Sequence, residues 1–162
     1  MSKQIHYYDR LTMALDDLLM CKEYCKIMLK LPLGEALSEE RTVYEALFVA
    51  FVVSYGRVFK FSNTVYPAHK KEVNENFRKF IKDMISKQEK KLQKLSERIL
   101  EKRDTAIAHS DAGSRNYQHY NNSTPYISYN PYYPYDYKEV SLALKLTENL
   151  IGDIVNEQNR VG

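Results

Sequence analysis

The apolar residues of the chain recur mostly at helical spacing. In the first segment they are separated by three, four or seven residues, which predicts a helix over about residues 4–30. Its apolar positions are Leu11, Leu15, Leu18, Cys25 and Leu29. Pro32 and Gly34 follow at once, and both residue types are typical of the end of a helix.

A second helix is predicted over about residues 39–60. Ser38 offers a side-chain cap, and Glu39 and Glu40 place carboxylates in the first turn, where they favour the helix dipole. The middle of this helix is apolar nearly all round, which is typical of the central helix of a bundle. Its apolar run over residues 46–53 is far shorter than the roughly 20 residues that cross a bilayer.

Three further helices complete the pattern. A short third helix has its apolar positions at Phe77, Phe80, Ile81 and Met84. Ser86 followed by Glu89 has the pattern of a capping box, so a fourth helix is predicted to start there and to run to about His109. A fifth helix begins near Asp136, whose carboxylate can cap it while Glu139 reciprocates.

Strand patterns are weak throughout, so we predict an all-α, antiparallel bundle of about five helices in one domain over residues 1–162. A long loop of about residues 112–136, rich in Tyr, Asn and Pro, is inserted before the last helix. Residues 116–137 hold eight of the 14 tyrosines and three of the five prolines, which disfavours a helix. The tyrosines either pack on the bundle or offer their flat faces to bases or to a partner.

Composition places the chain among folded, water-soluble proteins. Hydrophobic residues make up 44% of it and charged residues 28%, which argues against a disordered chain. The N-terminal residues have no apolar stretch typical of a signal sequence, so we expect a cytoplasmic protein that does not enter the membrane. Cys21 and Cys25 lie four residues apart on one helix face, without the further ligands that a zinc site needs, and are expected in the core.

The net charge of +3 is unevenly distributed. Residues 60–103 hold 13 basic and 6 acidic side chains, whereas residues 1–59 hold 7 and 8, and residues 104–162 hold 4 and 7. A lysine-rich helix is most often a solvated surface. The same segment would also attract a polyanion such as RNA, because a basic surface raises the local concentration of polyanions without any base contact.

The basic segment closes on RDTAIAH, residues 103–109. This motif has an arginine, then a polar residue, and six positions after the arginine a histidine among small residues. It resembles the signature of HEPN domains, which are small all-helical domains, and it is most similar to their abortive-infection branch. The resemblance implies a metal-independent endoribonuclease that needs no cofactor and acts in a toxin–antitoxin pair or in phage defence.

The resemblance also implies roles for three residues of the motif. His109 would act as general acid or base, because an imidazole titrates near neutral pH. Arg103 would hold the scissile phosphate and offset the charge that builds up on it. Asp104 would orient one of these two side chains. Attack by the ribose 2′-oxygen would then leave a 2′,3′-cyclic phosphate.

The spacing of the motif sets a geometric condition. On an ideal helix Arg103 and His109 lie about 120° apart and do not share a face. Either the helix loosens near His109, or the site combines groups from two chains. HEPN domains resemble the second case, so we expect a homodimer with residues 103–109 near its two-fold axis. A nucleotidyltransferase-type antitoxin is a further implied partner, although Asp111 stands where such toxins often carry the tyrosine that receives a nucleotide.

Two more cations are candidates for substrate binding. Arg57 lies towards the end of the apolar second helix, where a guanidinium needs a partner. It is expected to pair with an acidic residue of another helix or with the carbonyl groups of its own last turn, or else to point into the cleft of Arg103. Lys102, which directly precedes Arg103, is the second candidate.

Two other interpretations of the chain stay open. A HEPN-like bundle can bind RNA, a nucleotide or another protein without catalysing a reaction. Alternatively the match to the motif is accidental, and His109 caps the end of a helix, where the dipole favours a partly positive imidazole.

Overall fold

The computed structural model describes residues 3–60, 69–104 and 134–162. Over these ranges the chain forms α1 (Lys3–Met28), α2 (Glu39–Val58), α3 (Lys70–Ser86), α4 (Lys90–Lys102) and α5 (Tyr137–Val161), with no strand. The predicted all-α bundle is therefore confirmed. The predicted end of the fourth helix near His109 and most of the predicted loop over residues 112–136 lie outside the described residues. None of the described helices has the length and apolar character of a membrane span.

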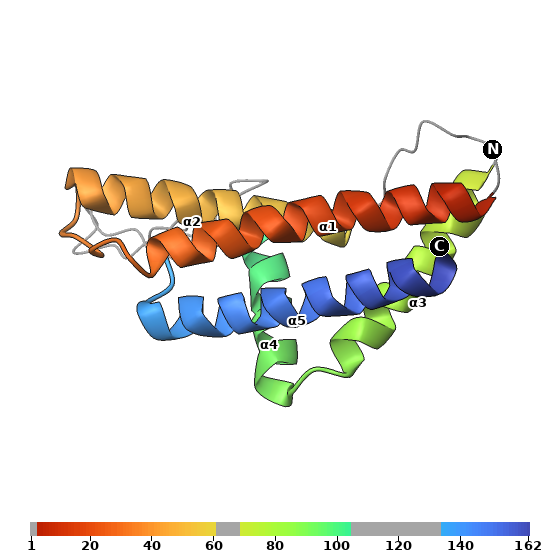
Figure 1. Ribbon diagram of the computed structural model, residues 1–162. Coiled ribbons are helices and arrows are strands. Elements are labelled where there is room, and N and C mark those ends of the chain that lie inside the picture. Colours follow the sequence, from red (N-terminus) through yellow and green to blue (C-terminus); the bar gives the residue numbers. More distant parts are fainter. Residues whose placement is uncertain (1–2, 61–68, 105–133) are drawn as a thin grey trace, which may run out of the picture.

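Helix α1 lies at the centre of the bundle. It runs antiparallel to both α2 and α5 and packs along the two of them (Figure 1). Helices α3 and α4 form a V on one side, and α4 crosses α5 to reach α2 (Figure 1). The two ends of the described chain lie together, where the side chain of Gln4 donates a hydrogen bond to the carbonyl oxygen of Val161.

The expectation that the second helix is the central one is wrong. The outer face of α2 exposes Val43 (44%) and Val53 (37%), whereas Phe48, Phe51 and Tyr55 on its inner face are buried. Helix α1 takes the central place because its apolar stripe meets α2 and α5 together. The small apolar residues on the outer face of α2 are what make this helix look buried in the sequence.

Two of the predicted caps are confirmed. The Ser38 hydroxyl accepts a hydrogen bond from the N–H of Arg41 (3.1 Å), and a carboxylate oxygen of Asp136 accepts one from the N–H of Glu139 (2.8 Å). The Glu139 carboxylate does not reciprocate at the cap but binds Arg98 of α4 (3.0 Å). Helices α2 and α5 therefore begin where their sequence signals place them.

The predicted capping box of the fourth helix is wrong. Ser86 is the last residue of α3, and its hydroxyl donates to the carbonyl oxygen of Asp83 (2.7 Å). Helix α4 begins only at Lys90. The turn between the two helices is held by the Gln93 amide, which donates to the carbonyl oxygens of Ser86 (3.1 Å) and Gln88 (2.7 Å). A glutamine of α4 thus satisfies the end of α3.

Arg10 of α1 is a cation in the core, at only 3% exposure. Its Nη2 atom donates to the carbonyl oxygens of Val58 (3.0 Å) and Lys60 (3.1 Å) at the end of α2. Its Cζ atom lies 3.9 Å from the centre of the Phe77 ring of α3. Burial lowers the pKa of Arg10, and Asp17 opposes this shift. Arg10 therefore caps α2 and joins three helices.

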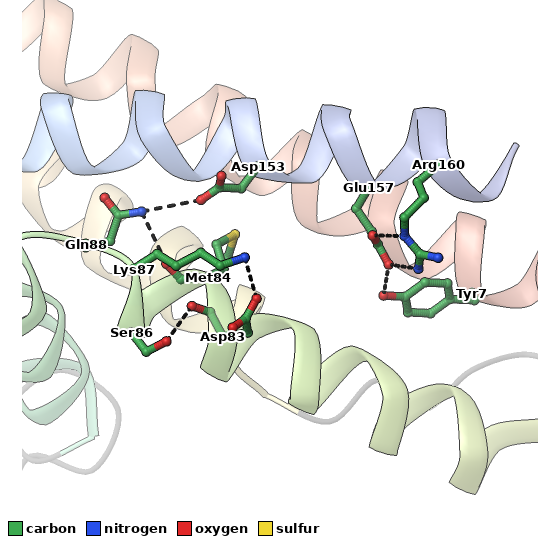
Figure 2. A network of polar contacts seen from close by, with 9 residues as sticks. All are labelled: Tyr7, Asp83, Met84, Ser86, Lys87, Gln88, Asp153, Glu157 and Arg160. Carbon is green, nitrogen blue, oxygen red and sulfur yellow. Dashed lines mark hydrogen bonds and ion pairs between the residues drawn. The ribbon is translucent and has the colours of Figure 1, made fainter.

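A polar network fastens α5 to α1 and α3 (Figure 2). Glu157 accepts hydrogen bonds from Tyr7 of α1 (2.9 Å) and from Arg160 of its own helix (2.6 Å). Gln88, which follows α3, donates to Asp153 (3.3 Å). Most of these groups are at least partly exposed, so each contact is expected to add little to stability.

The described end of the Tyr-rich segment packs on the bundle. Tyr135 is buried, with its ring 4.9 Å from that of Phe48, and its carbonyl oxygen accepts a hydrogen bond from Tyr44 (3.0 Å). The Tyr137 hydroxyl donates to the carbonyl oxygen of Leu31 (2.6 Å). For these two residues, packing on the bundle is the interpretation that holds.

Both cysteines are buried and free, as the sequence predicts. Burial raises the pKa of the Cys21 thiol and raises that of Cys25 to about 12. Both therefore stay as thiols at neutral pH, which removes their nucleophilicity. They act as small core residues in α1.

Buried tyrosines are expected to make the fold sensitive to alkali. Burial raises the pKa of Tyr55, and it raises that of Tyr44 to about 12. A tyrosine with a raised folded-state pKa stabilises the fold below the unfolded value of about 10, and this contribution disappears as the pH rises through the folded-state pKa. We expect the urea midpoint to stay level from about pH 6 to 8, to begin to fall near pH 8.5 as the thiols of Cys21 and Cys25 ionise in the unfolded chain, and to fall more steeply between about pH 10 and 12.

Tyr44→Phe tests this expectation. It removes one titrating group and the bond to Tyr135, so stability at pH 7 should fall while its decline above about pH 10 becomes shallower. Tyr8→Phe, at an exposed position, is the control and should leave the pH dependence unchanged. A wild-type midpoint that stays level up to pH 12 would contradict the assignment.

Candidate functional site

The C-terminal ends of α2 and α4 meet at Gly56 and Arg103. Helix α4 ends at Lys102, and Arg103 follows as its C-cap with helical backbone angles (φ −60°, ψ −47°). The Arg103 side chain crosses α2 directly over Gly56, so that a Cβ atom at position 56 would lie 2.9 Å from Cγ and 3.0 Å from Cδ of Arg103. Gly56 thus leaves the space in which Arg103 lies.

Lys60, Arg103 and Asp104 form a charged group, which we call the Arg103 cluster. Arg103 Nη1 donates to Asp104 Oδ1 at 2.6 Å, and Lys60 Nζ lies 3.1 Å from the same oxygen. Asp104 is 45% exposed and Arg103 is 22% exposed. The hydrogen bond from Arg103 lowers the pKa of Asp104, and Lys60 adds to this shift. Two cations that follow the ends of different helices, α2 and α4, therefore share one ionised carboxylate at the surface.

Sequence reasoning does not single out Lys60. It precedes Asp104 by 44 residues, so no local motif connects them. The available signal is that Lys60 follows Gly56 by four residues, just beyond the end of an apolar helix. Lys60 also lines a small hollow of about 50 Å³ between α2 and α3, together with Asn74 and Arg78.

Arg57 faces α1 and not α4. Its Nε atom lies 3.5 Å from Asp17 Oδ1, and its side chain is 63% exposed. This is the pairing with an acidic residue of another helix that the sequence suggests. The expectation that Arg57 lies in a buried environment is wrong, because the outer face of α2 is exposed to solvent. Its role in substrate binding stays a prediction.

Lys102 lies between α2 and α5. Its Nζ atom is 5.5 Å from the centre of the Phe48 ring. Burial lowers the pKa of Lys102, and the nearby Glu139 opposes this shift. The ammonium group is thus half-buried beside an aromatic face, and its role in substrate binding also stays a prediction.

Of the RDTAIAH motif, Arg103 and Asp104 are described, whereas residues 105–109 lie outside the described part of the chain. The structure brings these two side chains into direct contact. The predicted loosening of the helix near His109 lies outside the described residues and stays a prediction. The approach of His109 to Arg103, and the homodimer, stay predictions.

A second hollow of about 240 Å³ lies between α3 and α5 beside the network of Figure 2. It is lined by Phe80, Met84, Lys87, Asp153, Asn156, Glu157 and Arg160. Lys87 is paired with Asp83 at 2.6 Å, and Arg160 is paired with Glu157. Both cations of this hollow already have a carboxylate partner of their own, and Asp153 adds another negative charge, so it is a poorer site for an anion than the Arg103 cluster.

The Arg103 cluster is therefore the candidate functional site. Its two cations can bind an anion in the place of the exposed carboxylate, and its arginine opens the motif that the sequence singles out. Among the described residues, no three His, Cys, Asp or Glu side chains are placed to hold a metal ion together. No family model, curated protein or solved structure matches the chain.

Proposed function

We propose that the protein is a metal-independent endoribonuclease of the HEPN type. The observation that carries this proposal is the placement of Arg103 at the surface, held by Asp104 and beside Lys60, where the RDTAIAH motif begins. A guanidinium fixed by a carboxylate is suited to hold a phosphate. The polar residue after the arginine orients it, which is the role that the resemblance implies for Asp104.

Arg103 and His109 divide the chemistry. Arg103 binds the scissile phosphate and offsets the charge that develops as the phosphorus becomes five-coordinate. A histidine accepts the proton of the 2′-hydroxyl, and an imidazolium donates a proton to the leaving 5′-oxygen. The bond from the phosphorus to the 5′-oxygen breaks as the bond to the 2′-oxygen forms. The products are a 2′,3′-cyclic phosphate and a 5′-hydroxyl end.

A homodimer would complete this site. Two copies related by a two-fold axis near residues 103–109 bring two arginines and two histidines to one cleft, which meets the geometric condition set by the spacing of the motif. In this proposal the protein acts in the cytoplasm, in phage defence or as the toxin of a toxin–antitoxin pair. The antitoxin would be a nucleotidyltransferase-type partner.

A second candidate function is binding of RNA without cleavage. It is favoured by the basic side chains that α3 and α4 expose to solvent. These are Lys71, Arg78, Lys79, Lys82, Lys87, Lys90, Lys91, Lys94 and Arg98. Such a surface binds the phosphates of a strand whether or not the motif is active.

Cleavage of a mixed RNA pool in EDTA separates the two candidates. We expect the wild type to cleave it, and Arg103→Ala and His109→Ala each to lower the rate by about 100-fold or more, since each removes a group that acts in the transition state. Arg160→Ala is the matched control, because it removes an exposed arginine of α5 that lies outside both the cluster and the basic surface of α3 and α4. Circular dichroism checks that all variants fold.

Each other outcome has a clear meaning. Cleavage that survives in His109→Ala, or that requires added metal, would contradict the proposed mechanism. A folded wild type that binds RNA and does not cleave it favours the second candidate. A protein that sediments strictly as a monomer would count against the shared cleft.

A further inference from the structure

We propose that Lys60 and Arg103 form a two-cation clamp for one phosphate of an RNA strand, and that Asp104 occupies this clamp when no RNA is bound. The inference rests on the proposed function, because it uses the same Arg103. It adds Lys60 as a second phosphate-binding residue, and it makes Asp104 a competitor of the RNA phosphate for the two cations.

The geometry of the Arg103 cluster supports the clamp. Asp104 Oδ1 receives Arg103 Nη1 at 2.6 Å and lies 3.1 Å from Lys60 Nζ. The place of Asp104 Oδ1 is therefore a position for an anionic oxygen between two cations, one after the end of α2 and one after the end of α4. A phosphate oxygen has the same requirement, and arginine and lysine are the side chains that most often supply it.

Both arms of the clamp start from fixed parts of the fold. The stem of Arg103 lies against Gly56, which determines where its guanidinium emerges. The backbone of Lys60 is held by Arg10, whose Nη2 atom donates to the Lys60 carbonyl oxygen at 3.1 Å. The side chain of Lys60 is half-exposed, so its ammonium group is accessible to a strand.

Asp104 is suited to be displaced. Its carboxylate is 45% exposed, so it can turn into water without leaving a buried charge. Exchange of this carboxylate for a phosphate keeps both cations paired. Exposed ion pairs of this kind contribute little to stability, so the exchange disturbs the fold little. Asp104 would thus keep the clamp ordered and lower its affinity for RNA.

The test measures binding separately from cleavage. The probe is a fluorescein-labelled single-stranded RNA with 2′-O-methyl groups at every position, which cannot be attacked by its own 2′-oxygen. Fluorescence anisotropy is expected to show about tenfold weaker binding for Lys60→Ala and about tenfold tighter binding for Asp104→Asn. Lys26→Ala, which removes an exposed lysine paired with Glu23 on α1, is the matched control and should stay within about twofold of the wild type.

Combining the variants tests the clamp itself. If Asp104 competes for both cations, Asp104→Asn should tighten binding clearly less in the Lys60→Ala background than in the wild type. The salt dependence should also weaken by about one phosphate contact in Lys60→Ala. A general effect of charge on RNA affinity would not produce this coupling.

Three results would overturn the clamp. They are unchanged or weaker binding by Asp104→Asn, equal binding by Lys60→Ala and Lys26→Ala, and no binding by either the wild type or Asp104→Asn. Failure of the ribonuclease proposal gives a different pattern. If the uncleavable probe shows the expected coupling but unmodified RNA is not cleaved, the clamp proposal is supported and the ribonuclease proposal is contradicted.

Discussion

Replacing Arg10 by alanine is expected to lower the free energy of unfolding by about 2–5 kcal/mol. The change removes a large buried side chain and the donor that serves two carbonyl oxygens at the end of α2, of which the one at Val58 is buried and the one at Lys60 is partly buried. It also removes the cation from the face of Phe77, at a site without the solvent that weakens such contacts elsewhere. Since a domain of this size is held by about 5–15 kcal/mol, the variant should be close to unfolding at room temperature.

Chemical denaturation followed by circular dichroism measures this effect. Arg98→Ala is the matched control, because Arg98 also lies near an aromatic ring, Tyr135 at 5.9 Å, but it is on an exposed surface, where it is paired with Glu139 at 3.0 Å. It should cost about 0–1 kcal/mol. Arg10→Lys should fall between the two, because it keeps the charge and loses the planar group that lies on Phe77. Equal losses for Arg10→Ala and Arg98→Ala would show that burial of Arg10 contributes nothing.

The helices of this chain could be predicted largely because their ends carry local signals. Ser38 and Asp136 cap the helices that follow them, since a short polar side chain next to a free N–H needs no tertiary partner. Ser86 carried the same signal and misled, because its hydroxyl binds the carbonyl oxygen of Asp83 in the preceding turn. Serine makes either bond, and the sequence does not decide between them.

The interior of the bundle was harder to predict than its helices. Apolar residues on every side of the second helix indicated a central position, yet small residues such as Val43 and Val53 are tolerated on a surface. Arg10 was not singled out in the sequence. A single arginine beside an apolar stripe carries no local sign of burial, and only the close approach of three helices gives it its partners.

Two of the three residues of the Arg103 cluster were visible in the sequence. Arg103 and Asp104 were found because they are neighbours in a motif. Lys60 and Gly56 were not, because they come near only where α2 and α4 cross, and neither residue type is unusual at the end of a helix. Contacts between residues far apart in the sequence depend on how the helices pack, and the spacing of residues within one helix does not predict them.

Gly56→Ala is expected to disable the candidate site while leaving the fold nearly as stable as the wild type. Alanine in a helix is favoured over glycine by about 0.5–1 kcal/mol. Its methyl group would lie 2.9 Å from Cγ of Arg103, so one of the two must move. Arg103 has a flexible side chain and should turn away, because moving α4 would disrupt core contacts such as the 2.8 Å bond between Tyr55 and Ser96.

The gain in helix propensity and the loss of the Arg103 contacts with Gly56 and Asp104 should nearly cancel in the free energy of unfolding. RNA binding, in contrast, should fall as far as it does in Arg103→Ala. Gly152→Ala is the matched control, because nothing lies within 4 Å of a Cβ atom at that position of α5. It should gain about 0.5–1 kcal/mol and bind RNA like the wild type. Wild-type binding by Gly56→Ala would show that the path of Arg103 over Gly56 does not position the guanidinium. A loss of stability beyond about 2 kcal/mol would show instead that α4 moves and Arg103 does not.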